Sequence, residues 1–172
     1  MNNFLKKIFL IVVGTVFFLP INADENEFTN NNQYNFYTGN FDFSDHKQKA
    51  ILLGFQHQNE TLERQTFLGN ASPITGGFIT ANSAAYIYTG VEWNHDMGGK
   101  MTFTPSFTPG LYSQGNGKDL GHVIEFKTEI QASYALSESS SFGVSYNHIS
   151  NASLGDKNPG ANSYMFNYLK NF

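Results

Sequence analysis

The sequence contains no cysteine. A disulfide framework is therefore excluded, and so is the attachment of a lipid anchor to a cysteine side chain. A chain of this kind has to hold its fold without covalent cross-links, even in an oxidising compartment outside the cytoplasm.

Positive charge is also scarce. The 172 residues include 10 Lys and Arg against 14 Asp and Glu, which gives a formal net charge of −4 at pH 7. A nucleic-acid partner requires a basic patch that neutralises phosphates, and the sequence offers none. We therefore exclude nucleic acid as a partner.

Long apolar runs are missing as well. The apolar run near the N-terminus, Ile8–Leu19, is shorter than the ~20 residues that a membrane-spanning helix needs. Lys6 and Lys7 precede this run, and the small residue Ala23 follows it. This order predicts that residues 1–23 are a cleaved secretory signal, with a retained helical anchor as the alternative.

The remaining residues, 24–172, have the length of one domain. Residues 24–33 are acidic and rich in Asn, and we expect them to form a loose terminus of the exported chain. What the chain has in excess is aromatic residues, at 16% of the total with 17 Phe. A small soluble domain has little interior in which to bury so many rings, whereas a barrel that faces lipid can leave them on its surface.

Short runs in which apolar and polar residues alternate follow one another along the chain, separated by turn residues. Such alternation predicts strands with one apolar face. Eight strands are predicted: Tyr34–Phe43, Ala50–Gln58, Arg64–Ser72, Ala84–His95, Met101–Tyr112, His122–Leu136, Ser141–Ser150 and Asn162–Phe172. The glycine-bearing stretch Pro73–Ser83 is expected to be a loop.

Eight such strands fit either a soluble barrel that holds a ligand or an outer-membrane barrel. The two differ in which face points inward. One polar face carries Glu125, Lys127 and Glu129, and paired charges suit the interior of a small membrane barrel. An ordinary sandwich is a further alternative, since the signal of each strand is weak.

The last strand favours the membrane barrel. Its outer face carries Tyr164, Phe166 and Tyr168, and the chain ends in Phe172. An aromatic end of this kind resembles the C-terminal signature of outer-membrane barrels, and a strand of ~11 residues is long enough to span when tilted. The predicted fold class is all-β, an eight-stranded antiparallel outer-membrane β-barrel.

Three polar residues interrupt the apolar face of the last two strands. His148 and Ser150 end the seventh predicted strand, and Asn162 begins the eighth. If both chain ends are periplasmic, all three lie at the outer leaflet, which in a Gram-negative bacterium is lipopolysaccharide. Ester hydrolysis by Ser requires a base nearby and a group that orients the base. The alternative interpretation is a His and a Ser that only meet water or headgroups at the membrane surface.

The segment 148–164 reads HISNASLGDKNPGANSY, and it resembles the C-terminal motif of the lipid A 3-O-deacylases, a PagL-like family of the acyloxyacyl hydrolase group. The resemblance implies an eight-stranded outer-membrane barrel with a lipid-facing site. It implies that His148 is the base, that Ser150 is the nucleophile and that Asn151 helps to form the oxyanion hole. It implies neither a cofactor nor a metal.

Two positions depart from the family pattern. The acidic member of the triad falls on Asn162 here, and Ser153 stands where the family has Gly. An amide can orient His148 through its oxygen, but it supplies no charge. Asp156 in the loop is an alternative source of a carboxylate. The other histidines are scattered without metal-ligand spacing: His46, His57, His95 and His122.

The sequence therefore predicts an outer-membrane esterase that removes an acyl chain from lipid A of lipopolysaccharide. Its catalytic residues are predicted to be His148, Ser150 and Asn162, with Asn151 as the oxyanion donor. The alternative is a barrel of the same shape without catalysis, serving a structural or lipid-binding role.

Overall fold

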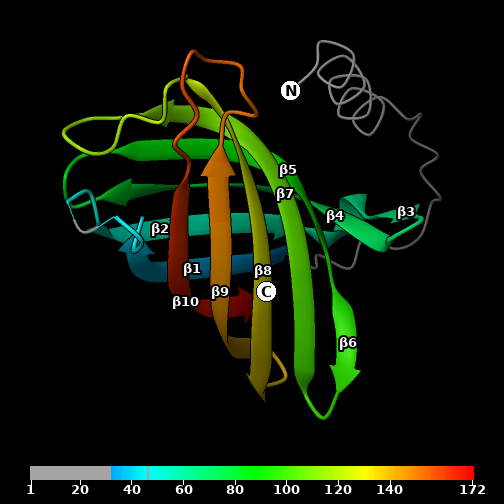
Figure 1. The fold of residues 1–172 in the computed structure, drawn as a ribbon. Helices are drawn as coiled ribbons and strands as arrows, with labels where there is room; N and C mark the ends of the chain where they lie inside the picture. Colours follow the sequence, from blue (N-terminus) through cyan, green and yellow to red (C-terminus); the bar gives the residue numbers. More distant parts are fainter. Residues whose placement is uncertain (1–31, 46) are drawn as a thin grey trace.

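The computed structural model describes residues 32–45 and 47–172, which form strands and one short 3₁₀ helix (Figure 1). The predicted signal, residues 1–23, and most of the predicted loose terminus lie outside the described residues. The elements are β1 Asn32–Phe41, β2 Ala50–Asn59, η1 Glu60–Leu62, β3 Arg64–Thr66, β4 Gly69–Thr80, β5 Ala85–Trp93, β6 His95–Gly98, β7 Met101–Ser113, β8 Ile124–Ser137, β9 Ser140–Ser150 and β10 Ala161–Asn171. In these described residues no helix has the length and apolar character to cross a membrane.

The eight long strands close into a barrel. Each of them pairs antiparallel with the next one along the chain, in the order β1, β2, β4, β5, β7, β8, β9 and β10. The ladder between β1 and β10 joins the first strand to the last. The short strands β3 and β6 pair with β4 and β7 and lengthen one part of the wall. The predicted eight-stranded antiparallel barrel is confirmed.

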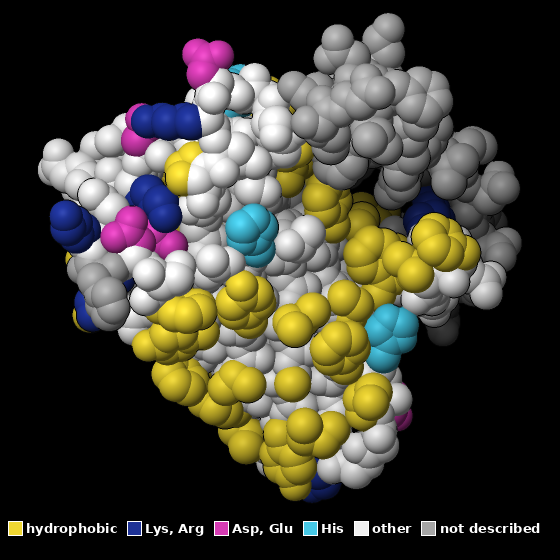
Figure 2. Space-filling view, viewed as in Figure 1, with side chains coloured by type: hydrophobic (Ala, Val, Ile, Leu, Met, Phe, Trp, Pro, Cys, Tyr) yellow, Lys and Arg dark blue, Asp and Glu magenta, His cyan; other side chains and the backbone are white. Residues whose placement is uncertain are grey.

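The apolar face points outward, as predicted. Tyr146, Phe166 and Tyr168 are exposed, whereas Glu125 and Lys127 are buried inside the barrel. Figure 2 views the face formed by β8, β9 and β10, and it shows hydrophobic side chains gathered over the lower part of that face. A barrel with aromatic rings on its outer face and charged side chains inside suits a lipid surrounding, because lipid acyl chains can cover the apolar outer face.

Polar side chains fill the interior, and several of them are joined by hydrogen bonds and an ion pair. Lys127 Nζ lies 2.7 Å from Glu129 Oε2 and 4.2 Å from the centre of the Tyr88 ring. The Tyr88 hydroxyl donates to Gln56 at 3.0 Å, and Gln56 donates to Glu92 at 2.9 Å. This network gives Lys127, Glu129 and Glu92 polar partners inside the barrel, whereas the two carboxylate oxygens of Glu125 have no hydrogen-bond partner among the described residues. A bonded network of this kind makes the wall a firm support for residues on its outer face.

Two sequence-based expectations about the fold are wrong, and both concern β4. The strand predicted over Arg64–Ser72 is interrupted by a turn at residues 67–68, so that β3 ends at Thr66 and β4 begins at Gly69. The stretch Pro73–Ser83 is not a loop, because β4 continues through it as far as Thr80. A Cβ on Gly76 would lie 2.8 Å from the Tyr88 hydroxyl, and a Cβ on Gly77 would lie 2.7 Å from the Tyr86 carbonyl. The two glycines are therefore strand residues that leave room for the neighbouring strand and its tyrosine.

The loops that connect the strands lie at the two ends of the barrel. Four of them meet at the end where β9 finishes, and we call them the mouth loops: 42–49, 81–84, 114–123 and 151–160. Both ends of the described chain, Asn32 and Phe172, lie at the opposite end, where Phe172 N–H donates to the Asn32 carbonyl at 3.0 Å. The predicted site residues thus all lie at the mouth.

Candidate active site

The predicted site residues gather where β9 and β10 meet the last mouth loop. His148 on β9 lies opposite Asn162 on β10 in the ladder. Ser150 is the last residue of β9 and pairs with Phe126 of β8. His148 and Ser150 lie two apart on one face, so their Cα atoms are ~6.5–7 Å apart by the rise of a strand. All three side chains are half-exposed on the outer surface.

A hydrogen bond joins His148 to Asn162. Nδ1 of His148 lies 2.8 Å from Oδ1 of Asn162. An amide oxygen can only accept, so Nδ1 carries the proton and Nε2 is left with its lone pair. This is the tautomer that a general base needs if it is to take a proton from a serine hydroxyl. Asp156, the other candidate partner, is exposed in the loop, and no bond between it and His148 is found among the described residues.

The same oxygen accepts a second hydrogen bond. The Tyr146 hydroxyl donates to Asn162 Oδ1 at 2.8 Å. Tyr146 was not among the residues predicted for the site. Its place two residues before His148, on the same face of the strand, is the signal that could have assigned it to the site.

Residues of loop 42–49 form hydrogen bonds with the backbone of Asn162 and with its side-chain Nδ2. Phe43 N–H donates to the Asn162 carbonyl at 3.0 Å, and Asn162 N–H donates to Asp42 at 3.4 Å. The Ser44 hydroxyl donates to Asp42 at 3.2 Å and accepts from Asn162 Nδ2 at 3.5 Å. Asp42 itself pairs with Lys118 at 2.6 Å, and its side chain is only 1% exposed. Two mouth loops thus fix the residue that orients His148.

The geometry does not fit Asn151 as an oxyanion donor. The Asn151 side chain is buried, and its Nδ2 donates to the carbonyls of Leu120 at 2.8 Å and Lys157 at 2.9 Å. Its backbone N–H donates to Asn158 at 3.0 Å. Position 151 follows Ser150 in the alternation and therefore points inward. All of its N–H groups are engaged in fastening the loops around the site.

Gly160 lies against the histidine ring. A Cβ at this position would lie 2.9 Å from Cε1 and 3.4 Å from Nε2 of His148. The backbone of Gly160 also has a φ of +64°, which favours glycine. The end of the loop therefore approaches the reactive edge of the imidazole as closely as a residue without a side chain allows.

The loop turns sharply directly after Ser150. Ala152 and Ser153 both have left-handed backbone, with φ of 52° and 63°. Leu154 N–H donates to the Asn151 carbonyl at 3.0 Å and closes the turn. Left-handed backbone costs a non-glycine residue ~1–2 kcal/mol. The three hydrogen bonds donated by Asn151 offset that cost. Ser153 is therefore one of the two strained positions in this turn.

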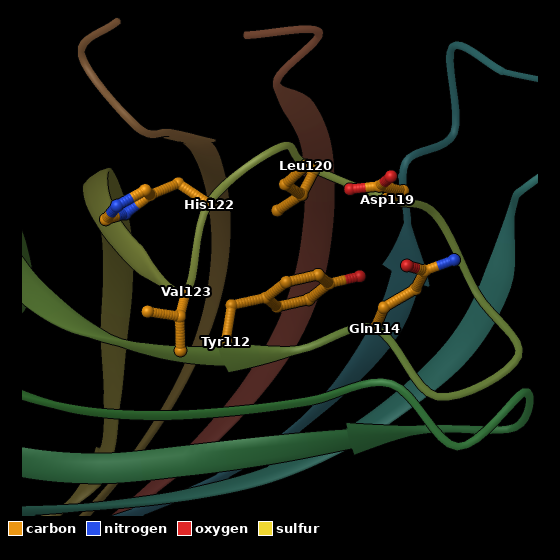
Figure 3. A pocket seen from close by; sticks show the side chains of 6 residues that line it. All are labelled: Tyr112, Gln114, Asp119, Leu120, His122 and Val123. Atoms are coloured by element: carbon orange, nitrogen blue, oxygen red, sulfur yellow. The ribbon is translucent and has the colours of Figure 1, made fainter. Parts of the chain in front are cut away.

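A hollow of about 290 Å³ lies beside the site, under loop 114–123. It is lined by Tyr112, Gln114, Asp119, Leu120, His122 and Val123 (Figure 3). Figure 3 shows Asp119 and Gln114 on one side of the Tyr112 ring and His122 on the other. Neither His148 nor Ser150 lines it, so this hollow is separate from those two residues. In residues 32–45 and 47–172 no three His, Asp or Glu side chains group as metal ligands.

Comparison with known proteins gives a family and a fold. The family model described as "Lipid A 3-O-deacylase (PagL)" matches residues 36–171. No curated protein matches the chain in sequence. Among solved structures, the outer membrane enzyme PagL has a TM-score of 0.60 at 19% identity, covering 80% of this chain and 98% of that chain. The match thus spans nearly the whole of that enzyme.

Two further barrels are similar in shape. A structure from the de novo design of transmembrane β-barrels has a TM-score of 0.56 at 9% identity, covering 83% of this chain and 96% of its own. Neisserial surface protein A has a TM-score of 0.56 at 10% identity, again covering 83% of this chain and 96% of its own. Likeness at such low identity concerns the fold alone.

Proposed function

This chain belongs to the lipid A 3-O-deacylase (PagL) family, and on that premise we propose how its residues remove an acyl chain from lipid A. Family membership makes it an outer-membrane β-barrel and a lipid A deacylase, an ester hydrolase. The proposal concerns the residues that act, and the single observation that carries it is the hydrogen bond between His148 Nδ1 and Asn162 Oδ1.

In the proposed reaction, Ser150 is the nucleophile and His148 is the base. Nε2 of His148 takes the hydroxyl proton as Ser150 Oγ attacks the ester carbonyl of an acyl chain. The bond to the lipid A oxygen breaks, and the protonated His148 returns its proton to that oxygen. Water then hydrolyses the acyl-enzyme with His148 acting as base again. No cofactor takes part in this scheme.

Asn162 is proposed as the orienting group. Its oxygen keeps the proton of His148 on Nδ1 throughout, which is the part of a triad acid's role that an amide can fill. It supplies no negative charge to the imidazolium that forms during attack. We therefore propose a working but slower enzyme than one with a carboxylate at this position.

The role proposed for Asn151 is to hold the loops in position. Its two side-chain donors join loop 151–160 to loop 114–123, and its backbone N–H joins the start of the last loop to Asn158. A buried amide with these partners stabilises the turn that follows Ser150. Replacement of Asn151 would therefore disturb the position of the nucleophile.

The proposed orientation places the mouth at the cell surface. The mouth loops then lie outside the cell, and residues 1–23 are a cleaved signal for export. With the mouth outward, His148 and Ser150 face the outer leaflet, where the acyl chains of lipid A begin. The half-exposed side chains of the site and the exposed aromatic rings below it support this arrangement.

The second candidate is a structural or lipid-binding barrel, and the amide at position 162 favours it. Expression of the wild type and of Ser150→Ala in the same Gram-negative host separates the two. Mass spectrometry of the extracted lipid A should show a species lacking one acyl chain only with the wild type. Intact lipid A in both strains, with both barrels inserted in the outer membrane, would favour the non-catalytic barrel.

A further inference from the structure

Two hydroxyl groups contact opposite ends of the Asn162 side chain. Tyr146 donates to Oδ1 at 2.8 Å, on the side of His148. Ser44 Oγ accepts from Nδ2 at 3.5 Å, on the side of loop 42–49. The two ends of an amide have almost the same shape but opposite hydrogen-bonding character, so the orientation of Asn162 decides what His148 meets.

The hydroxyl proton of Ser44 already takes part in a hydrogen bond. Its hydroxyl donates to Asp42 at 3.2 Å, and the carboxylate of Asp42 can only accept. The buried carboxylate of Asp42 also pairs with Lys118 at 2.6 Å. Ser44 therefore presents lone pairs to Asn162, and the end of the amide that satisfies them is Nδ2.

We propose that Asp42, Ser44 and Tyr146 form a relay of positioning residues that holds Oδ1 of Asn162 toward His148. The relay rests on the function proposed above. If the amide turned over, Nδ2 would donate to His148 Nδ1, the ring proton would move to Nε2, and the base would be lost. A carboxylate has two equivalent oxygens and needs no such relay. The relay is therefore required only because residue 162 is an amide, whose oxygen must be kept toward His148.

The relay also places a negative charge behind the site. Asp42 Oδ1 accepts from Asn162 N–H at 3.4 Å as well as from Ser44. Asp42 is therefore linked to Asn162 twice, directly at the backbone N–H and through Ser44 at the side-chain Nδ2, although it does not touch the His148 ring. Asp42 contacts Asn162 and not the reacting groups, so it is a positioning residue.

Tyr146→Phe and Ser44→Ala test the relay in the purified, detergent-folded barrel. Each removes one hydrogen bond to Asn162 and leaves the strand pairing intact. We expect kcat for lipid A deacylation to fall roughly two- to twelve-fold in each, with KM unchanged. The matched control is Tyr164→Phe, because Tyr164 pairs with Tyr146 across the ladder but its hydroxyl accepts from Asn40 at 2.7 Å. The control should keep the wild-type kcat.

Asn162→Asp provides a background in which the loss of either hydroxyl group should no longer matter. With an isosteric carboxylate at position 162, Tyr146→Phe and Ser44→Ala should lower kcat no further, because either oxygen can face His148. A structural role for the two hydroxyls would instead give the same loss in both backgrounds. Equal losses in the Asn and Asp backgrounds would overturn the relay.

Nitrogen NMR of the His148 ring gives a readout that does not depend on activity. The wild type should show the proton on Nδ1, and the double variant Ser44→Ala with Tyr146→Phe should show a mixture with Nε2. An unchanged Nδ1 tautomer in the double variant would contradict the relay even if the wild type proved inert on lipid A. An inert wild type with the expected tautomer change would count against the proposed function only.

Discussion

Asn162 Oδ1 lies 2.8 Å from His148 Nδ1, so an amide occupies the place at which the resemblance leads us to expect an acid. The contact has the geometry of a triad and lacks its charge. An imidazolium on the apolar outer face of the barrel is poorly screened by water, which increases the effect of any charge beside it. We therefore expect the residue at position 162 to limit the rate of deacylation.

Asn162→Glu should raise the deacylation rate, since a carboxylate stabilises the imidazolium that forms as Ser150 attacks. Asn162→Ala should lower the rate about two- to twelve-fold, which corresponds to the ~0.5–1.5 kcal/mol of one hydrogen bond. The measurement is the initial rate of fatty-acid release from lipid A in detergent. A faster Asn162→Ala would show that the contact with His148 is not productive.

Gly160→Ala should reduce activity through His148. The new methyl group would lie 2.9 Å from Cε1 of the ring and push it away from Asn162. Gly99→Ala is the matched control, because Gly99 has a similar φ of +61° and nothing within 4 Å of the added methyl group. Both variants should lose ~1–2 kcal/mol of stability from the left-handed backbone, but only Gly160→Ala should lose deacylation. Equal activity in the two would mean that the loop does not constrain the ring.

Lys118→Ala should destabilise the mouth. It leaves the carboxylate of Asp42 buried without its cation, and breaking a buried ion pair costs ~3–5 kcal/mol. Lys157→Ala is the control, because Lys157 is 60% exposed in its pair with Asp119 and should contribute little. Urea unfolding in micelles measures both. A similar midpoint for the two variants would contradict the view that the Asp42–Lys118 pair fastens the mouth.

The lipid-facing assignment predicts a difference between two valines. Val144 on β9 is half-exposed on the outer face, and Val123 is half-exposed in a mouth loop. Val144→Lys should cost ~2–4 kcal/mol of stability in a bilayer, the cost of a lysine near the middle of the membrane. Val123→Lys should cost much less. Unfolding in lipid vesicles compares them, and an equal cost would place β9 outside the membrane.

The strand order and the sidedness of the barrel could be predicted from the sequence, because alternation with a period of two is a local signal. β9 and β10 begin within one residue of the predicted positions. β4 could not be predicted, since Gly76 and Gly77 look like loop residues until the tyrosines of the neighbouring strand are in place. Glycines required by a partner strand carry no local signal of that partner.

The same limit applies to the site. His148, Ser150 and Asn162 could be chosen because they interrupt an aromatic face, and the structure brings His148 and Asn162 into contact. Asp42 and Ser44 lie more than one hundred residues before Asn162 and reach it only because β1 pairs with β10. Asn151 was assigned from the resemblance, and although the alternation places it on the inward face, its carbonyl partners in two distant loops could not be read from the sequence.

The most direct test of the central claim is single-turnover hydrolysis of lipid A by the purified, folded barrel, followed by mass spectrometry of both the lipid and the protein. The wild type should release one fatty acid from each lipid A and carry a transient acyl group on Ser150. Ser150→Ala and His148→Ala should release none while they keep the heat-modifiable migration of a folded barrel. Release by Ser150→Ala at the wild-type rate, or a folded wild type that leaves lipid A intact, would contradict the account.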